Sequence, residues 1–381
     1  MLAYFSDEPV IRTMSGDQNG LVYYTVTAAT GMQNDTILSG QTAFTNSAFC
    51  PDGHEDLEIG SLLRSMISGQ ERNIKTLQHL NNQGCSITQG TFIFNSYFTV
   101  SDSSGGTSDD YSIIYDTRGI TAPESGSTYI HQPGSGYVAN YFPETEIMHG
   151  QYFSLMWRMP SNALETVSYT FGFEYTYTAQ GPNPHDPSYN VLERNQIQTV
   201  TGQSFRYSGT ADWQDWGEGH SAQRGRFYLY HEKEGYMYLT PWLYPKFCDD
   251  PDTVYLYWVN SMGGIDFKRG VMTKSLNHED STYEANIGID ERLDFRSRIY
   301  HQTKWNSYTF STSLISDEDS PSIADICGAR WAWLYIPGDT PMWRSVKVTD
   351  SKATVKTYRN QGAKLYNYTF ELEDATKYKS V

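Results

Sequence analysis

Apolar and polar residues alternate along much of this chain. Between positions 169 and 177 the odd positions are all Tyr or Phe, and the even positions carry Thr, Gly or Glu. The stretch 366–373 repeats this pattern. Because side chains of a strand point alternately to its two faces, both stretches predict half-buried β-strands. Further strands are expected at 21–26, 92–98, 113–115, 152–157, 227–230, 236–239, 254–259 and 346–348.

The stretch 254–259 differs from the others because it is almost continuously apolar. Such a run is typical of a strand that is covered on both faces. It is followed by Asn260, a Gly263-Gly264 pair and Asp266. Asn and Gly tolerate left-handed backbone geometry and Asp can cap backbone N–H groups, so a sharp turn is expected here. We interpret this segment as determining the fold rather than performing chemistry.

Helical patterns are scarce. Apolar residues follow helical spacing over 59–67, with a possible continuation to Leu80, and Ser320-Pro321 predicts a short helix ending near Cys327. Residues 231–235 predict a hairpin turn, and the ranges 101–110 and 181–187 predict loops. The expected fold class is mainly β, with two or three antiparallel sandwich-like or barrel-like domains and one or two short helices.

The length of 381 residues sets the expected number of domains. A sandwich or barrel domain rarely exceeds about 250 residues, so two or three are predicted. The strand patterns lapse near 117–126 and 216–226. We therefore expect an N-terminal β-domain with the amphipathic helix at 1–118, a middle β-rich insertion or decoration module at 119–225 and a C-terminal β-domain at 226–381.

Charge and composition exclude several classes of function. Forty-four acidic and 28 basic residues give a net charge of −16, which repels phosphate backbones, so no sequence-specific nucleic acid partner is expected, although a local basic patch can still exist. Aromatic residues make up 15% of the chain, too many for a disordered protein. No long apolar run predicts membrane insertion, and the first nine residues show no secretion-signal pattern.

Motifs for catalysis or metal binding are missing from the sequence. The four cysteines are far apart and form no CxxC pair, so we expect thiols rather than a zinc or redox centre: Cys50, Cys85, Cys248 and Cys327. There is no HExxH, no GxSxG and no phosphate-binding glycine loop. A triad of Ser, His and Asp need not be close in sequence, and nothing here favours one. We predict no catalytic residue, no cofactor and no metal site.

One segment still groups candidate chemistry, the run from 212 to 220. It combines four polar side chains with two tryptophans: Asp212, Asp215, Glu218 and His220, with Trp213 and Trp216. Three interpretations are open: a calcium site, a carboxylate pair for glycoside hydrolysis, or a solvated loop anchored by its tryptophans. The spacing lacks the glycine and the terminal glutamate of an EF-hand loop, which favours the anchored loop. His185-Asp186, among prolines, is either a metal ligand pair or plain surface.

Two parts of the chain resemble structural proteins of tailed bacteriophages that infect gut Bacteroidetes, the crAss-like phages. The run from Val254 to Phe267 is similar to a signature of strand, Asn, Gly-Gly, Asp and aromatic residue in their tail, neck and tail-hub proteins. The second part begins at Trp305, continues through the short helix and the strands expected at 331–336, 343–349, 354–358 and 366–372, and closes with Glu373-Asp374-Ala375. Together they cover about 130 residues, and the middle of the chain has no such match.

The resemblance implies a non-enzymatic virion protein that forms part of a ring in the phage tail or neck. Its partners would be copies of itself and adjacent tail, neck or portal proteins, and it would assemble in the host cytoplasm. In this hypothesis the surplus of aromatic residues holds thin β-domains and neighbouring copies together. The alternative is a carbohydrate-binding or glycan-active surface protein, with Trp213 and Trp216 as the sugar platform and Asp215 or Glu218 as polar contacts.

Overall fold

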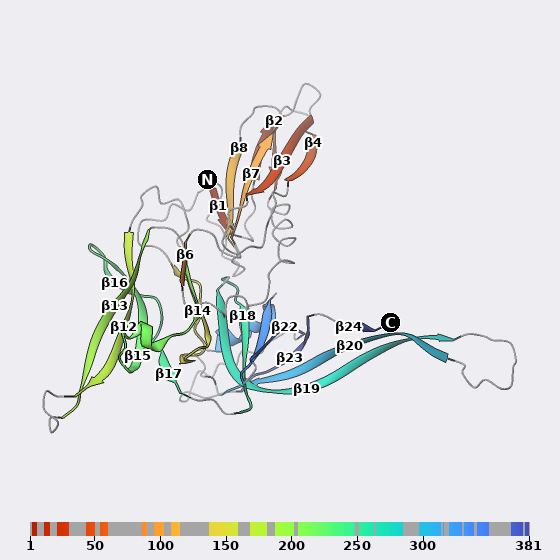
Figure 1. Ribbon diagram of the computed structural model, residues 1–381. Helices are drawn as coiled ribbons and strands as arrows, with labels where there is room; N and C mark the ends of the chain where they lie inside the picture. Colours follow the sequence, from red (N-terminus) through yellow and green to blue (C-terminus); the bar gives the residue numbers. More distant parts are fainter. Residues whose placement is uncertain are drawn as a thin grey trace, which may run out of the picture. The chain divides into compact units, whose positions relative to one another are not determined.

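The structure is a computed structural model, shown in Figure 1. It describes the following residues: 2–5, 11–15, 21–29, 43–49, 54–59, 86–89, 95–102, 108–114, 137–158, 168–180, 187–201, 205–247, 251–262, 264–284, 297–313, 315, 320–329, 331–338, 341–349, 367–375 and 378–380. The chain divides into two compact units. One comprises Met1–Cys248 with Ser261–Ile265, and the other Asp249–Asn260 with Asp266–Val381.

The first unit begins with a five-stranded sheet in the order β1-β8-β7-β3-β4. Its strands are β1 (Leu2–Phe5), β3 (Leu21–Ala29), β4 (Ala43–Phe49), β7 (Asn95–Asp102) and β8 (Ser108–Ile114). A separate pair joins β2 (Ile11–Ser15) to β5 (His54–Glu58). The loop predicted at 101–110 is longer than the observed connection, because β7 and β8 pair as far as Ser101 and Ser108. The predicted helix lies outside the described residues, apart from Ile59, which is buried.

Two further sheets of this unit pack face to face. One has the order β6-β14-β11-β9 and the other β13-β12-β15-β16. The bounds are β6 (Ser86–Gln89), β9 (Tyr137–Val138), β11 (Tyr152–Arg158), β12 (Ser168–Ala179), β13 (Tyr189–Thr201), β14 (Phe205–Thr210), β15 (Ala222–His231) and β16 (Gly235–Tyr238). A parallel pair joins β10 (Glu146–Met148) to β17 (Tyr244–Lys246). Strand β15 crosses position 225, where the sequence analysis placed the boundary between the middle and C-terminal domains. The division into three domains stays a prediction.

Aromatic rings fill the space between these two sheets, as the alternation in the sequence predicts. Phe171 of β12 lies 5.2 Å from Phe205 of β14, and Phe227 of β15 lies 5.5 Å from Phe153 of β11, measured between ring centroids. Phe173 and Phe227 are closer still, at 4.7 Å. Ring pairs of this kind contribute about 0.5–1.5 kcal/mol each beyond the area they bury. The core is therefore built from interlocking rings contributed by both sheets.

The second unit contains a seven-stranded sheet in the order β19-β18-β21-β22-β23-β20-β24. Its strands are β18 (Thr253–Val259), β19 (Ile265–Glu284), β20 (Ser297–Thr312), β21 (Ala332–Ile336), β22 (Met342–Val348), β23 (Thr369–Asp374) and β24 (Tyr378–Ser380). Every residue of β18 is buried, so the prediction of a strand covered on both faces is confirmed. Leu256 and Trp258 join the main apolar core, and Tyr257 packs on Phe267 and Trp343.

A turn follows β18 at Ser261 and Met262, as predicted. Asn260 does not adopt the left-handed backbone conformation that the sequence allowed. Its side-chain amide donates a hydrogen bond to the Asp266 carboxylate at 2.6 Å, and both residues are buried. This bond ties the end of β18 to the start of β19.

A short helical segment covers part of the second unit's core. It consists of α3 (Ser320–Ala324) followed by the 3₁₀ turn η3 (Asp325–Gly328), close to the prediction. Ile323 and Ile326 point into the apolar core. The described residues therefore form a mainly β protein of antiparallel sheets with short helices, as predicted. No helix in this part of the chain has the length and apolarity needed to cross a membrane.

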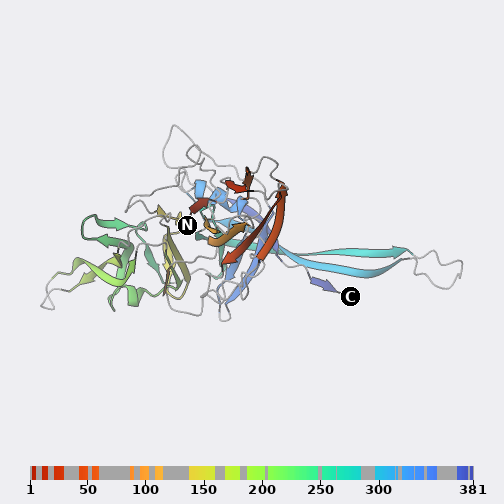
Figure 2. The same cartoon turned by 90° about the horizontal axis from the view of Figure 1, so that it is seen from above.

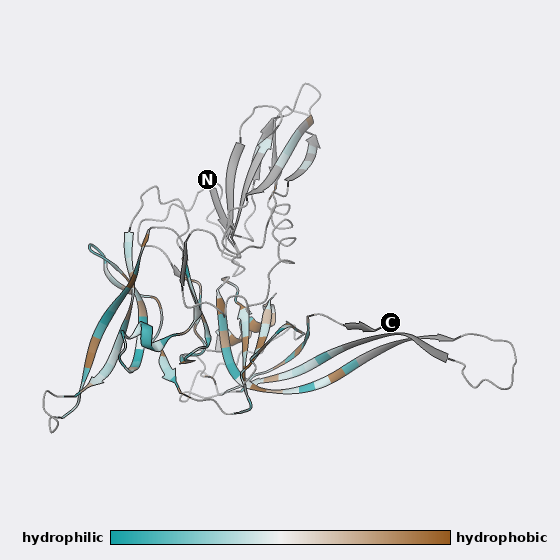
Figure 3. Cartoon of the chain, viewed as in Figure 1, coloured by the Kyte–Doolittle hydropathy of each residue, from teal (hydrophilic) through white to brown (hydrophobic). Residues whose placement is uncertain are grey.

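Strands β19 and β20 continue beyond their sheet as a long antiparallel ribbon (Figures 1 and 2). They pair without interruption from Gly270 opposite Thr312 to Glu284 opposite Ser297, with one bulge near Ser281. The fifteen paired residues of β19 span roughly 50 Å at about 3.4 Å each, and the nine beyond Ser275, where β23 no longer pairs with β20, span roughly 30 Å. Strand β23 supports β20 only from Ser307 to Ser311. Hydrophilic and hydrophobic stretches alternate along the part of the two strands nearest the sheet (Figure 3).

Gly172, in the middle of β12, lies at a close approach between β12 and its two neighbouring strands, which a substitution can test. A Cβ atom at this position would collide with the Tyr228 ring and the Asn195 carbonyl oxygen. Gly172→Ala is therefore expected to lower the free energy of unfolding by about 1–3 kcal/mol, measured by urea denaturation. Thr176→Ala, on the same face of the same strand, is the matched control and should change it by less than about 1 kcal/mol. Equal stabilities of the two variants would contradict the close approach.

Candidate functional site

The segment that the sequence singled out forms the short helix α2 (Trp213–Trp216). Its N-cap is Asp212, whose carboxylate accepts hydrogen bonds from the backbone N–H groups of Gln214 at 3.0 Å and Asp215 at 3.1 Å. Satisfying the first N–H groups in this way is the usual reason for an aspartate before a helix. The carboxylate of Asp212 is thereby assigned a structural role.

Both tryptophans of this segment face the core. Trp216 is 1% exposed and donates from Nε1 to the Tyr207 hydroxyl at 2.7 Å, while Trp213 donates to the Ile147 carbonyl oxygen at 2.9 Å. Trp216 packs 5.1 Å from Phe227. The segment does not present the exposed aromatic platform suggested for sugar binding, because its rings are part of the sandwich. The anchored-loop interpretation describes the observed arrangement.

The remaining candidates of this segment do not converge. His220 stacks on Tyr177 with 4.0 Å between ring centroids, and its Nε2 atom lies 4.0 Å from the Glu193 carboxylate. Glu193 also accepts hydrogen bonds from Tyr175 and Tyr177, both at 3.1 Å. Burial, with the nearby Glu193, raises the pKa of both tyrosines. Among the described residues no three His, Cys, Asp or Glu side chains are placed to share a metal ion. His185 and Asp186 lie outside the described residues.

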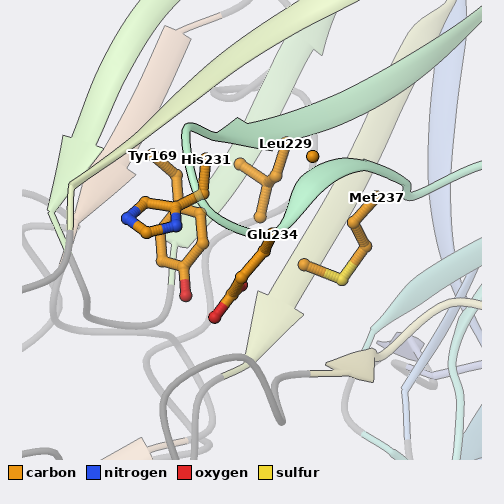
Figure 4. A pocket seen from close by; sticks show the side chains of 6 residues that line it. Tyr169, Leu229, His231, Glu234 and Met237 are labelled. Carbon is orange, nitrogen blue, oxygen red and sulfur yellow. The ribbon is translucent and has the colours of Figure 1, made fainter.

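A small pocket opens beside the β15–β16 turn (Figure 4). Its volume is about 210 Å³, and it is lined by Tyr169, Leu229, His231, Glu234, Gly235 and Met237. Ligand pockets usually measure about 300–1,000 Å³, so this one is small. The His231 ring lies 5.5 Å from the Tyr169 ring, and its buried Nδ1 atom has no hydrogen-bond partner in the described part of the chain. We assign no chemistry to it.

The opposite face of the β13-β12-β15-β16 sheet carries a charged network that the sequence analysis did not single out. At its centre is Glu174 of β12, which is fully buried. Arg194 of β13 donates from Nε to Glu174 Oε2 at 2.7 Å, and Arg226 of β15 donates from Nε and Nη2 to Oε1 at 2.9 and 2.7 Å. Tyr238 donates to Oε2 at 3.1 Å. The carboxylate is therefore bonded from both neighbouring strands.

Aromatic rings hold the guanidinium groups of this network. Arg226 lies 3.3 Å from the Tyr238 ring centroid and 4.3 Å from that of Trp242, and Arg224 also stacks on Trp242 at 4.3 Å. Arg194 stacks on Tyr236 at 4.2 Å. Each such contact is worth about 0.5–2 kcal/mol. We call this surface the arginine–tyrosine face: Arg194, Arg224, Arg226, Tyr236, Tyr238 and Trp242.

The sequence contained a signal for this face. In β15 the even positions 224, 226, 228 and 230 are Arg, Arg, Tyr and Tyr, and Glu174 occupies an even position of β12. Cross-strand pairing sets Arg226 and Arg194 on either side of Glu174. Only the register brings these residues together, because they are 20 and 52 positions from Glu174 in the chain.

Comparisons with known proteins leave the family open. No family model matches the chain, and no curated protein matches it. The matches among solved structures include the crystal structure of CBD12 from CALX1.2, which is 9% identical over 61% of this chain and 79% of that chain, with a TM-score of 0.13. A likeness this weak carries no argument about fold or function. Both functions considered from the sequence, the virion protein and the carbohydrate-binding protein, stay predictions.

Glu174 gives a prediction about stability and pH. Burial alone raises its pKa, but the hydrogen bonds from Arg226 and Arg194 outweigh burial and hold the pKa below its ordinary value of 4.5. A carboxyl group with a lowered folded-state pKa stabilises the fold above pH 4.5, and this contribution is lost as the pH falls through the folded-state pKa. Glu174→Gln is expected to cost about 3 kcal/mol at neutral pH, since two arginines lose their partner.

Urea denaturation of both proteins at a series of pH values checks this prediction. The stability difference between wild type and Glu174→Gln should be largest near neutral pH and shrink as the pH falls below 4.5. The matched control is Glu232→Gln, at the exposed β15–β16 turn, which should follow wild type at every pH. A difference that grows on acidification would show that the carboxylate is not stabilised by its arginines.

Proposed function

We propose that this chain is a non-enzymatic structural protein of a phage virion, forming part of a ring in the tail or neck. The resemblance of 254–267 and of the C-terminal strands to crAss-like phage tail and neck proteins supports this proposal. The residues of the first resemblance form β18, the following turn and the beginning of β19. The proposed partners are further copies of the chain and adjacent tail, neck or portal proteins, assembled in the host cytoplasm into the virion.

The β19–β20 ribbon is the observation that carries the proposal. A two-stranded ribbon is at best marginally stable in water, because it lacks a third strand or a packed face. Beyond Ser307 the described support is limited to β24, which pairs with β20 from Gln302 to Lys304. An arm of this length gains stability when it lies on another subunit, which is what a ring or tube of identical copies provides.

The distribution of apolar residues on the ribbon agrees with such a contact. Met272 packs against the core of the second unit, and Leu276 lies four residues further along the same face of β19, with Lys274 between them. Leu276 is 67% exposed, and nothing in the described part of the chain covers it. The arm therefore presents an apolar side chain beside a charged one, a mixture that is common in interaction surfaces.

The test is the assembly state of a ribbon-shortened variant. Removing residues 277–305 and joining Leu276 to Asn306 through Asn-Gly should form a tight hairpin, because these two residues are a cross-strand pair. The deletion also removes the partners of β24, the last three-residue strand, but the pairing of β20 with β23 remains, so the body of the unit should stay folded. Circular dichroism and thermal unfolding of the variant check that it is folded. Wild type, mixed with its neighbouring virion proteins, should form rings in negative stain and mass photometry, and the variant should not.

A point variant refines this test. Leu276→Asp replaces the exposed apolar side chain with a charged one and should reduce ring formation at least tenfold, whereas Thr273→Asp, on the opposite face of the same strand, serves as the matched control. Wild-type protein that remains a stable monomer even with its neighbouring virion proteins would rule out the proposal. Rings that form equally well from the shortened variant would rule out the role of the ribbon.

A further inference from the structure

The arginine–tyrosine face concentrates positive charge in a strongly acidic chain. Arg194 and Arg226 pair with the buried carboxylate of Glu174, and Arg224 shares the Trp242 ring with Arg226. These four side chains sum to two positive charges, whereas the whole chain carries −16. A local excess of the opposite sign attracts an anionic partner at short range even when the protein as a whole repels it. The face is therefore electrostatically distinct from the average surface of this protein.

The face also retains unused hydrogen-bond donors. Arg226 directs Nε and Nη2 toward Glu174, which leaves its Nη1 atom without a hydrogen bond to a described residue, whereas Arg194 bonds to both Glu174 and Tyr238. Arg224 stacks on Trp242 and forms neither a hydrogen bond nor an ion pair within the described part of the chain. Because the rings and Glu174 fix the orientation of these planar groups, little side-chain entropy remains to be lost on binding.

We propose that the arginine–tyrosine face docks an acidic protein segment. Arg224 and the Nη1 group of Arg226 receive carboxylates of Asp or Glu side chains, since a guanidinium group matches a carboxylate in geometry. The exposed rings of Tyr236 and Tyr238 supply the apolar contact. This combination of Tyr, Trp and Arg is typical of the residues that dominate binding energy in protein interfaces. The same positive charges can also attract a nucleic acid or an acidic glycan, and the test below separates these occupants.

The proposal is independent of ring formation and is tested on the free protein. The probe is immobilised poly-L-glutamate, and binding is measured by biolayer interferometry at ionic strengths of about 0.02 M and about 0.2 M. Wild type should bind, and the higher salt concentration should weaken the affinity. Arg224→Glu should weaken it at least tenfold, because Arg224 supplies the uncompensated charge. Its fold should persist, because Arg224 does not contact Glu174.

Two further variants sharpen the result. Lys233→Glu makes the same change of charge at the exposed β15–β16 turn, away from the face, and should change the affinity less than twofold. Arg224→Lys keeps the charge without the planar group and should fall between wild type and Arg224→Glu.

Three outcomes would overturn the proposal. The first is no binding of poly-L-glutamate by wild type, and the second is equal binding by wild type and Arg224→Glu. The third is tighter, Arg224-dependent binding of oligothymidylate or polygalacturonate, which would assign the face to a nucleic acid or an acidic glycan instead. Because the assay uses free protein, none of these outcomes depends on whether rings form.

Discussion

The register of β12 against its two neighbours is the constraint on which the first unit depends. The odd residues of this strand, such as Phe171 and Phe173, fill the aromatic core, and Glu174 lies on the other face between two arginines. Since side chains alternate, a slip of one residue would move a charged group into the ring layer and a phenylalanine onto the open face. Burying the charge and exposing the phenylalanine would both destabilise the fold. The core and the outer face of the sheet therefore favour the same register of β12.

In the second unit, one strand is buried on both of its faces. Strand β18 is apolar at nearly every position and is buried on both sides, with Trp258 in the main core and Tyr257 in a second cluster of rings. Its end is held by the buried pair Asn260 and Asp266. The β13-β12-β15-β16 sheet of the first unit therefore has an open polar face on which a partner can bind, whereas β18 exposes neither of its faces.

Local pattern was sufficient to predict much of the fold. The alternation over 169–177 and the apolar run over 254–259 identified β12 and β18, because each reports directly which faces are buried. Pattern failed where distant residues decide the outcome. The sequence favoured a loop anchored by Trp213 and Trp216, but it could not show that their partners are Ile147 and Tyr207, on other strands. The arginine–tyrosine face was missed because it depends on cross-strand pairing, including the bulge at Phe171 and Gly172.

The antiparallel geometry of the ribbon has a consequence for how this protein can evolve. Gly270 and Thr312 are paired, so the chain leaves the sheet and returns to it at the same place. Adding or deleting matched residues on β19 and β20 changes the reach of the arm by about 3.4 Å per pair and leaves the body of the domain untouched. The reach of the arm can therefore be adjusted in small steps, separately from the stability of the fold.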